Sequence, residues 1–255
     1  MDTMMKEQAL RALGLLDLTS LNDTDTDETI IGLCAKAHGE FGHTAAVCVW
    51  PRFVKLAKKE LKGTPVRVAT VVNFPHGGTD VEAVVAETEQ SVADGADEID
   101  VVLPYKAFMD GDLAAAKAVL DATRKACEGK IMKVIIESGV LEHANIISEA
   151  SRLSIECGAD FIKTSTGKTP VSATLEAANA MLEVIRESGK PVGFKASGGV
   201  RTTEQAVDYM TLADKIMGPK WAGLMTFRFG ASGLRDSLLA SAGFSAASEP
   251  AKEGY

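Results

Sequence analysis

The chain has 255 residues, of which 46% are hydrophobic and only 5% aromatic, and its formal net charge is −8 at pH 7. This length and composition suit one domain with a large aliphatic core, such as parallel strands covered by helices bury. The acidic balance argues against nucleic acid or an anionic membrane surface as the main partner, but local positive groups can still bind a small anion.

Strand and helix patterns alternate along the whole chain. A short amphipathic helix is predicted at residues 3–13, ahead of the first strand. Apolar or β-branched runs typical of strands lie at 15–19, 44–50, 66–72, 98–103, 133–138, 161–166, 192–197 and 226–232. Helices are predicted between and after them, near 27–37, 52–62, 79–94, 112–127, 142–157, 172–188, 202–217 and 234–242.

This alternation predicts an α/β fold with a parallel sheet and right-handed crossovers. Eight units without a linker favour a closed, single-domain (β/α)8 TIM barrel at residues 1–244, with the helix at 3–13 as an extra element. An open Rossmann-type sheet is less well supported, because no GxGxxG fingerprint follows an early strand. Small and polar residues at 245–255 predict a flexible C-terminal tail.

Targeting signals and metal-binding patterns are not evident. Residues 1–16 carry charges and no secretory hydrophobic segment, and no apolar run approaches the roughly 18 residues of a membrane span. The four cysteines lack CxxC spacing and the four histidines are not spaced for joint ligation, so no metal is predicted. We expect a cytoplasmic protein with reduced, mostly buried cysteines.

Lys163 and Lys195 each lie in the middle of an apolar run, and lysine is costly to bury. Strand side chains alternate, so if Ile162 and Phe194 pack against helices, Lys163 and Lys195 point into the barrel. Two ammonium groups on adjacent strands cannot both ionise cheaply. One of them then becomes the neutral amine that attack on a carbonyl requires.

Carboxylates in other strands leave an alternative open. Each lysine could instead pair with Asp17, Asp100 or Glu137 and only hold the core together. Asp100, inside an apolar strand, is a candidate acid or base, or could orient a water that moves protons. Asp17 either takes part in this chemistry together with Asp100 or pairs with a lysine. Cys48 is a further candidate for the pocket, because it lies near the carboxyl end of its strand, where barrels carry their chemistry.

Turns rich in small residues follow the last three predicted strands. Barrels often bind phosphate at the loops after strands 7 and 8, where glycines let backbone N–H groups approach an anion. A phosphate cradle is therefore predicted there. Its candidate residues are Gly167, Lys168, Gly198, Gly199, Arg201, Ser232 and Gly233.

Six stretches occur in a fixed order: LDLT at 16–19, ADEIDVV at 96–102, KVIIE at 133–137, FIKTSTG at 161–167, GFKASGGVR at 193–201 and RFGAS at 228–232. Together they resemble the deoxyribose-phosphate aldolases, a family of class I aldolases that form a Schiff base, over essentially the full chain. The resemblance implies a TIM barrel without cofactor or metal.

The resemblance also implies roles for individual residues. The Schiff-base lysine matches Lys163, the second lysine Lys195 and the acid/base aspartate Asp100. The family's phosphate-site glycines and serine match Gly167, Gly198, Gly199 and Ser232. Gly233 stands where some members have a second serine, and Tyr255 matches a C-terminal tyrosine that aids proton transfer in some members.

The implied reaction cleaves 2-deoxy-D-ribose 5-phosphate reversibly to D-glyceraldehyde 3-phosphate and acetaldehyde. The implied partners are thus a phosphorylated sugar and a small aldehyde, and a homodimer is suggested by the resemblance alone. Two alternatives remain open. One is another Schiff-base aldolase or transaldolase-like barrel enzyme, and the other is a phosphate-binding barrel without chemistry.

Overall fold

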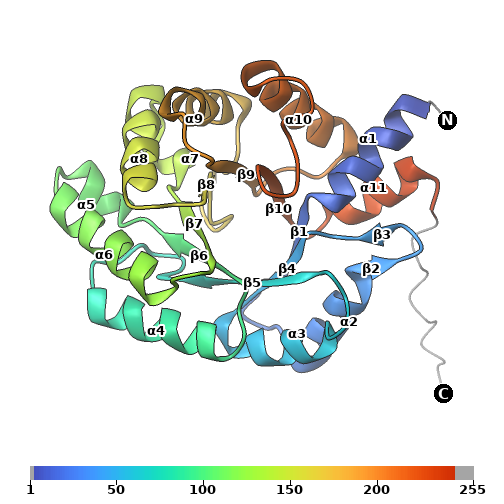
Figure 1. Ribbon diagram of the computed structural model, residues 1–255, viewed down its shortest axis with the longest axis horizontal. Coiled ribbons are helices and arrows are strands. Elements are labelled where there is room, and N and C mark those ends of the chain that lie inside the picture. Colours follow the sequence, from blue (N-terminus) through green and yellow to red (C-terminus); the bar gives the residue numbers. More distant parts are fainter. Residues whose placement is uncertain (1–2, 245–255) are drawn as a thin grey trace.

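The structure, a computed structural model, describes residues 3–244, and its centre is a closed barrel of eight parallel strands (Figure 1). Around the barrel the strand order is β1-β10-β9-β8-β7-β6-β5-β4. The strands are β1 (Leu16–Thr19), β4 (Ala46–Val49), β5 (Arg67–Val72), β6 (Glu98–Val102), β7 (Ile131–Ile135), β8 (Phe161–Lys163), β9 (Gly193–Ser197) and β10 (Phe227–Ala231). The predicted TIM barrel is confirmed.

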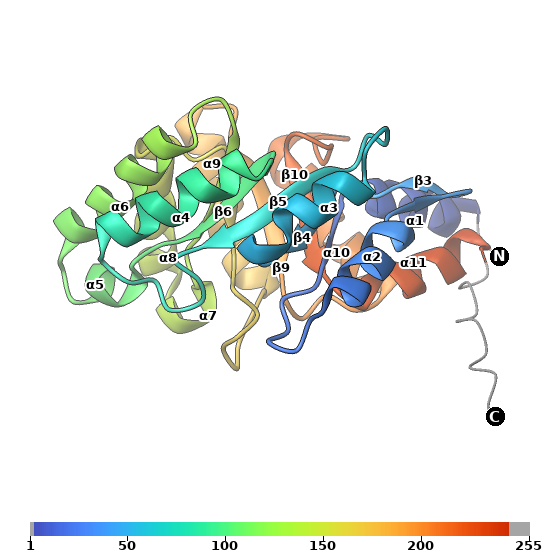
Figure 2. The same ribbon diagram turned by 90° about the horizontal axis from the view of Figure 1, so that it is seen from below.

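Helices surround this barrel on its outside, as two views at right angles show (Figures 1 and 2). They are α2 (Asp27–Lys36), η1 (Pro51–Phe53), α3 (Val54–Glu60), α4 (Val81–Ala93), α6 (Leu113–Ala126), α8 (Ala144–Glu156), α9 (Leu175–Ser188), α10 (Thr203–Met217) and α11 (Leu234–Ala242). The extra N-terminal helix is also present as α1 (Thr3–Gly14), which packs against α11. The predicted tail at 245–255 lies outside the described residues.

Three short elements were not predicted, because each is too brief to show a periodic pattern. They are the hairpin of β2 (His38–Gly39) and β3 (Gly42–His43), and the helices α5 (Tyr105–Met109) and α7 (Ser138–Leu141). The strand predicted at 133–138 also begins and ends earlier. Glu137 has a left-handed backbone with φ 56°, which turns the chain out of the sheet and into α7.

The barrel interior has two different walls. Small or apolar side chains from β4 and β5 form a separate cluster, in which Ala46, Cys48, Ala69 and Val71 pack with Leu21. The strands β8 and β9 lie across the barrel from β4 and β5. An eight-stranded barrel is only wide enough for side chains to fill it. The small wall therefore leaves room for long charged side chains from the opposite strands.

The register places these charged residues side by side. Lys163 pairs with Lys195 on β9, and Lys195 pairs with Arg228 on β10. Ile162 and Phe194 belong to the core shared with the helices, so the predicted inward direction of the two lysines is confirmed. All four cysteines, Cys34, Cys48, Cys127 and Cys157, are free and buried.

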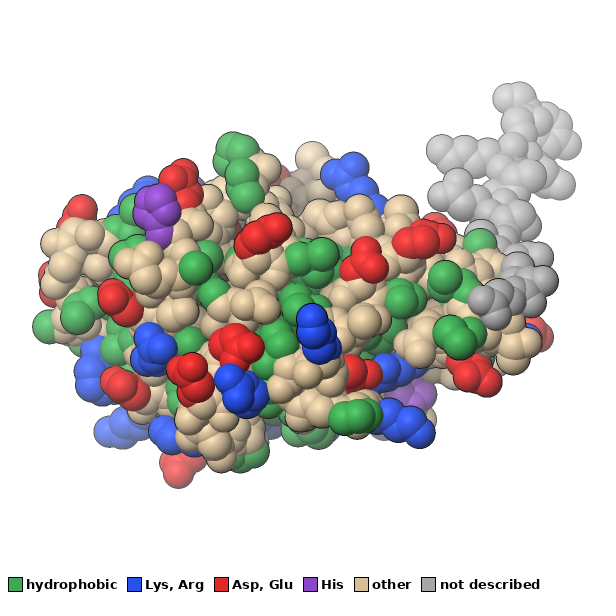
Figure 3. Space-filling model, turned by 90° about the horizontal axis from the view of Figure 1, so that it is seen from above, with side chains coloured by type: hydrophobic (Ala, Val, Ile, Leu, Met, Phe, Trp, Pro, Cys, Tyr) green, Lys and Arg blue, Asp and Glu red, His purple; other side chains and the backbone are tan. Residues whose placement is uncertain are grey.

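The outer surface is mixed in charge on the face formed by the helices at the top of Figure 1. Figure 3 shows acidic and basic side chains interspersed there, without the single-sign patch typical of a nucleic-acid-binding surface. Within residues 3–244, no helix combines the length and apolar character needed to cross a membrane.

Candidate active site

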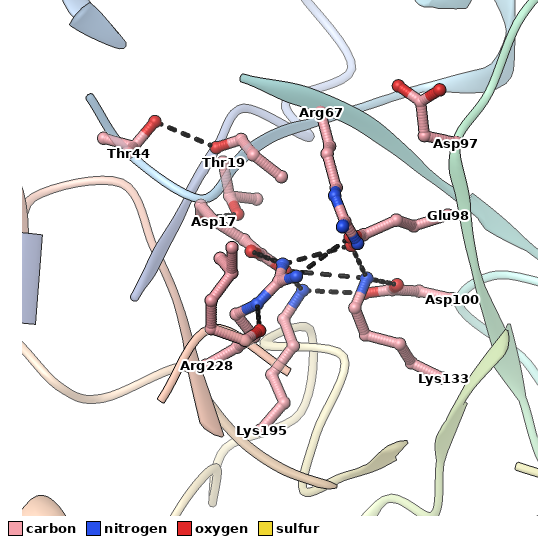
Figure 4. Close-up of polar contacts among 12 residues, drawn as sticks. Asp17, Thr19, Thr44, Arg67, Asp97, Glu98, Asp100, Lys133, Lys195 and Arg228 are labelled. Carbon is pink, nitrogen blue, oxygen red and sulfur yellow. Dashed lines mark hydrogen bonds and ion pairs between the residues drawn. The ribbon is translucent and has the colours of Figure 1, made fainter. Parts of the chain in front are cut away.

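Seven charged side chains from six strands meet inside the barrel. They are Asp17 on β1, Glu98 and Asp100 on β6, Lys133 on β7, Lys163 on β8, Lys195 on β9 and Arg228 on β10. Each is at most 2% exposed. Figure 4 shows the three carboxylates interleaved with Lys133, Lys195 and Arg228. Charges this deeply buried persist only when they are paired and hydrogen-bonded, so the contacts decide which groups stay ionised.

Asp100 lies at the centre of this network. Its Oδ1 accepts a hydrogen bond from Lys133 at 2.6 Å, and its Oδ2 accepts from Lys163 at 2.9 Å and from Lys195 at 2.8 Å. Burial by itself would raise the pKa of Asp100, but the charges of the three lysines outweigh it and hold the pKa well below its ordinary value. Asp100 is therefore a carboxylate at neutral pH.

The other two carboxylates bind the remaining cations. Asp17 accepts from Lys195 at 2.5 Å and from Arg228 at 2.7 Å. Glu98 forms ion pairs with Lys133 at 2.5 Å and with Arg228 at 3.0 Å. Lys195 and Arg228 thus each contact two carboxylates, and Lys133 contacts three, because it also lies 3.6 Å from Asp17.

Lys163 differs from these three cations. Among the described residues its one carboxylate partner is Asp100, and that oxygen is shared with Lys195. Burial lowers the pKa of Lys163, repulsion from Lys195 lowers it further, and the opposing pull of Asp100 does not restore the ordinary value. Of the site's amines, Lys163 is therefore the one that most easily becomes neutral.

Both neighbouring lysines keep their protons. Burial tends to lower the pKa of Lys195, but Asp100 and Asp17 outweigh it and the net change is upward. The pKa of Lys133 is also raised, by Asp100 and Glu98 against the effect of burial. Four buried cations face three carboxylates, and the partly exposed Arg67 also pairs with Glu98 at 3.2 Å. The network thus holds more positive than negative charge, which favours the loss of a proton from Lys163.

A cavity of about 270 Å³ lies at the carboxyl ends of the strands and joins the predicted phosphate turns. Its lining includes all seven phosphate-binding candidates: Gly167, Lys168, Gly198, Gly199, Arg201, Ser232 and Gly233. The structure therefore brings together turns that are separated by more than sixty residues along the chain. Thr19, Leu21 and Asn22 also line it and were missed, although their place just after the first strand was a usable signal.

Backbone geometry makes this cavity suitable for an anion. Gly167, Gly198 and Gly199 have φ of 79°, 77° and 84°, values that side chains other than glycine rarely adopt. Helix α11 begins just after Gly233, which provides no side-chain cap, so the first N–H groups of the helix remain available to an anion. Lys168 adds a positive charge, and its Nζ is held by the carbonyl of Leu21 at 2.6 Å.

Glu137 does not pair with a lysine, contrary to the alternative that the sequence left open. Its carboxylate accepts from the N–H of Thr166 at 3.2 Å, from the Thr166 hydroxyl at 2.5 Å and from the Thr169 hydroxyl at 3.2 Å. Those residues flank Gly167 and Lys168. Glu137 thus fixes the shape of the turn after β8 rather than balancing charge in the barrel.

Three members of the ion network were not assigned a role from the sequence, namely Glu98, Lys133 and Arg228. The signal that identified Lys163, a charged residue inside an apolar strand, was present at each of them. Cys48, a predicted pocket residue, is fully buried in the apolar wall, where burial raises the pKa of its thiol. Tyr255 lies outside the described residues.

The histidines stay away from the network. His38, His76 and His143 are exposed and His43 is partly exposed. Within the part of the chain that the structure describes, no group of three or more His, Cys, Asp or Glu residues is placed to hold a metal ion.

Comparison with known proteins identifies similar sequences and folds. The family model described as "DeoC/LacD family aldolase" matches residues 11–240. Two similar crystal structures are each named "putative deoxyribose-phosphate aldolase". The one from Coccidioides immitis is 32% identical, with TM-score 0.80, and the match covers 89% of this chain and 85% of that one. The one from Toxoplasma gondii ME49 is 23% identical, with TM-score 0.87, covering 94% and 96%.

A third similar structure is the deoxyribose phosphate aldolase from Aeropyrum pernix, described as a unique tetramer. It is 22% identical, with TM-score 0.72, and the match covers 94% of this chain and 98% of that one. At the identities of the Toxoplasma gondii and Aeropyrum pernix proteins, the likeness shows the barrel fold alone.

Proposed function

This chain belongs to the DeoC/LacD family of aldolases, and we propose that it is a class I aldolase that cleaves 2-deoxy-D-ribose 5-phosphate reversibly to D-glyceraldehyde 3-phosphate and acetaldehyde. The observation that carries the proposal is the state of Lys163. It is a buried lysine whose pKa is lowered, it lies beside a second lysine, and it sits at the carboxyl end of a barrel strand. Those are the requirements of an amine nucleophile in this fold.

In the proposed reaction, neutral Lys163 attacks the C1 aldehyde of the open-chain sugar. The nitrogen forms a bond to C1, water leaves, and an iminium results. The iminium draws the electrons of the C2–C3 bond as the C3 hydroxyl loses its proton. Glyceraldehyde 3-phosphate departs, and the enamine left on Lys163 is protonated and hydrolysed to acetaldehyde.

Asp100 and Lys195 have complementary roles in this proposal. Asp100 is ionised and contacts the Nζ of Lys163, so it stabilises the positive charge that the iminium carries. A carboxylate with so low a pKa is a poor store for a proton. Protons therefore move through a water oriented by Asp100. Lys195 keeps its charge and lowers the pKa of Lys163.

The phosphate cavity sets the orientation of the substrate. Its glycine turns and the start of α11 present N–H groups, and Lys168 and Arg201 supply positive charge. Holding the phosphate there directs the aldehyde end of the sugar toward the barrel centre and Lys163. Ser232 adds a hydroxyl to this cradle, while Gly233 adds only its backbone.

Reductive trapping tests the assignment of the nucleophile. The enzyme is treated with acetaldehyde and borohydride, and the modified residue is located by mass spectrometry of peptides. We expect one stable ethyl adduct, on Lys163, and no adduct in Lys163→Met. The exposed residue Lys190 provides a matched control, because Lys190→Met is expected to trap acetaldehyde as the wild type does. An adduct on Lys195, or none, would refute the mechanism.

Substrate choice separates this proposal from another Schiff-base aldolase on the same barrel. We expect acetaldehyde to be preferred as the donor over ketones and longer aldehydes, with glyceraldehyde 3-phosphate as acceptor. A donor screen that favours a ketone would keep the Schiff base but change the reaction. We also propose a cytoplasmic location, in keeping with four free buried cysteines, and a homodimer, to be checked by sedimentation.

A further inference from the structure

A hydroxyl without a hydrogen-bond partner faces the phosphate cavity from β9. It belongs to Ser197, the last residue of that strand, two positions after Lys195. Because strand side chains alternate, Ser197 points into the barrel on the same side as Lys195. It is 7% exposed and lines the cavity. Among the described residues, its N–H and carbonyl bond the Thr164 hydroxyl, whereas its Oγ makes no hydrogen bond.

This hydroxyl can be reached from the cavity. Within the described residues, the buried hydroxyl oxygens that are both unpaired and sealed from solvent are those of Ser138 and Ser165. The Oγ of Ser197 is unpaired as well, but it is not sealed in this way. A molecule bound in the cavity can therefore accept a hydrogen bond from it.

The other hydroxyls of this cavity are already committed or are exposed. Thr19 donates its hydroxyl proton to a main-chain carbonyl at 2.8 Å, and Thr166 donates to Glu137 at 2.5 Å. Ser232 is exposed to solvent, in the turn before α11. Each hydroxyl has one proton to donate. Among the described residues that line the cavity, Ser197 is therefore the buried hydroxyl whose proton remains available to a ligand.

Gly230 on β10 packs against both Ser197 and Lys195. It pairs with Ser197 in the register, and a Cβ added to it would lie 2.6 Å from the Oγ of Ser197 and 2.9 Å from the Cε of Lys195. Those two atoms are thus no more than 5.5 Å apart, the sum of these distances. In the other direction, Ser197 is followed at once by the phosphate-turn residues Gly198 and Gly199. The hydroxyl therefore lies between the ion network and the phosphate turns.

This position corresponds to one hydroxyl of the open-chain sugar, a step that rests on the proposed function. With C1 bonded to Lys163 and the phosphate on C5 held by the turns, the C3 and C4 hydroxyls lie between them. The C3 hydroxyl is at the bond that breaks, and it gives its proton to the water oriented by Asp100. The C4 hydroxyl is next to the carbon that bears the phosphate, just as Ser197 is next to the phosphate turns.

We propose that Ser197 donates a hydrogen bond to the C4 hydroxyl of the sugar, and that it thereby selects acceptor aldehydes with a hydroxyl beside the carbonyl. A substrate without that hydroxyl would leave Ser197 unpaired in a cavity from which the bound substrate excludes water, and this weakens binding. Ser197 makes no hydrogen bond with the described members of the ion network, so its contact affects binding and not the protonation of Lys163.

The binding of two stable phosphates tests this contact without catalysis. D-Glycerol 3-phosphate carries the hydroxyl in question and 3-hydroxypropyl phosphate lacks it, and each is titrated into the full chain by calorimetry. We expect the wild type to bind D-glycerol 3-phosphate about threefold to tenfold more tightly, the usual worth of one hydrogen bond. In Ser197→Ala this difference is expected to disappear, because D-glycerol 3-phosphate binds more weakly while 3-hydroxypropyl phosphate is unaffected.

Two further variants show whether the effect is specific. Ser232→Ala, in the phosphate cradle, is expected to weaken both phosphates by the same factor. Ser148→Ala, on the outer helix α8, is the matched control and is expected to change neither. Equal weakening of both phosphates in Ser197→Ala would mean that its hydroxyl binds the phosphate group. That result would overturn the proposal, as would unchanged binding of both, or a wild type that does not distinguish them.

Kinetics separate contact with the substrate from a structural role. Ser197→Ala is expected to raise the KM for 2-deoxyribose 5-phosphate about threefold to tenfold. It is expected to leave unchanged the acidic limb of the pH–activity profile and the trapping of acetaldehyde, which has no such hydroxyl. A shifted limb would mean that Ser197 acts through Lys195 and would overturn the proposal. If acetaldehyde is not trapped on Lys163, the proposed function fails, whereas the two phosphates still decide what the Ser197 hydroxyl binds.

Discussion

Replacing Lys195 by methionine tests how the reactive amine is produced. The change removes one positive charge and keeps most of the side-chain volume. The Nζ atoms of Lys163 and Lys195 both contact Oδ2 of Asp100, at 2.9 and 2.8 Å, so they lie no more than 5.7 Å apart, the sum of these distances. Two unit charges that close repel by about 3 kcal/mol at an effective dielectric constant of about 20.

Loss of this repulsion favours protonated Lys163. An energy of about 3 kcal/mol lowers the ratio of neutral to protonated Lys163 about a hundredfold at any given pH. Asp100 also loses a competing partner, which strengthens its pairing with Lys163 in the same direction. The pKa of Lys163 therefore rises in Lys195→Met, and the acidic limb of the activity profile moves to higher pH.

The assay is the initial rate of borohydride trapping with acetaldehyde as a function of pH. The position of the acidic limb reports the protonation of Lys163 even where the maximal rate falls for other reasons. Lys195→Arg keeps the charge and is expected to leave the limb near its wild-type position. Circular dichroism checks that both variants are folded. A limb that does not move in folded Lys195→Met would refute the argument that Lys195 lowers the pKa of Lys163.

The remaining predictions concern the phosphate turns and the buried carboxylates. Gly198→Ala places a Cβ 2.7 Å from the Oγ of Ser172, at a backbone φ of 77° that alanine rarely adopts. We therefore expect a several-fold higher KM for the phosphorylated substrate and a free energy of unfolding in urea that is about 1–2 kcal/mol lower. An unchanged KM would contradict this. Glu137→Gln removes the charge that holds the Thr166 turn and is expected to raise the same KM without moving the pH profile. The three carboxylates of the ion network have lowered pKa values in the folded protein. Their contribution to the stability of the folded state is therefore complete above their unfolded-state pKa of about 4 and is lost as the pH falls below it. We expect Tm to drop steeply below this pH, and the drop to be shallower in Asp100→Asn.

Much of the fold follows from local patterns. Short apolar runs and intervening helical patterns predicted every barrel strand, because burial on both faces gives a parallel strand a nearly continuous apolar sequence. Short elements such as α7 were missed, because four residues carry no period. The end of β7 was misplaced, because nothing in an apolar run shows that Glu137 adopts a left-handed backbone.

The sequence by itself determined which lysines point inward, since strand alternation is a local property, and the register of Lys163 opposite Lys195 confirms it. It also marked the glycine turns that line the phosphate cavity. The family resemblance pointed to Lys163, but only the tertiary structure shows why that amine, rather than Lys195, loses its proton more easily. That choice depends on how many carboxylates lie within hydrogen-bond reach of each Nζ, and those carboxylates come from strands distant in the sequence. Asp17 holds Lys195 across 178 positions, whereas Lys163 has to share Asp100.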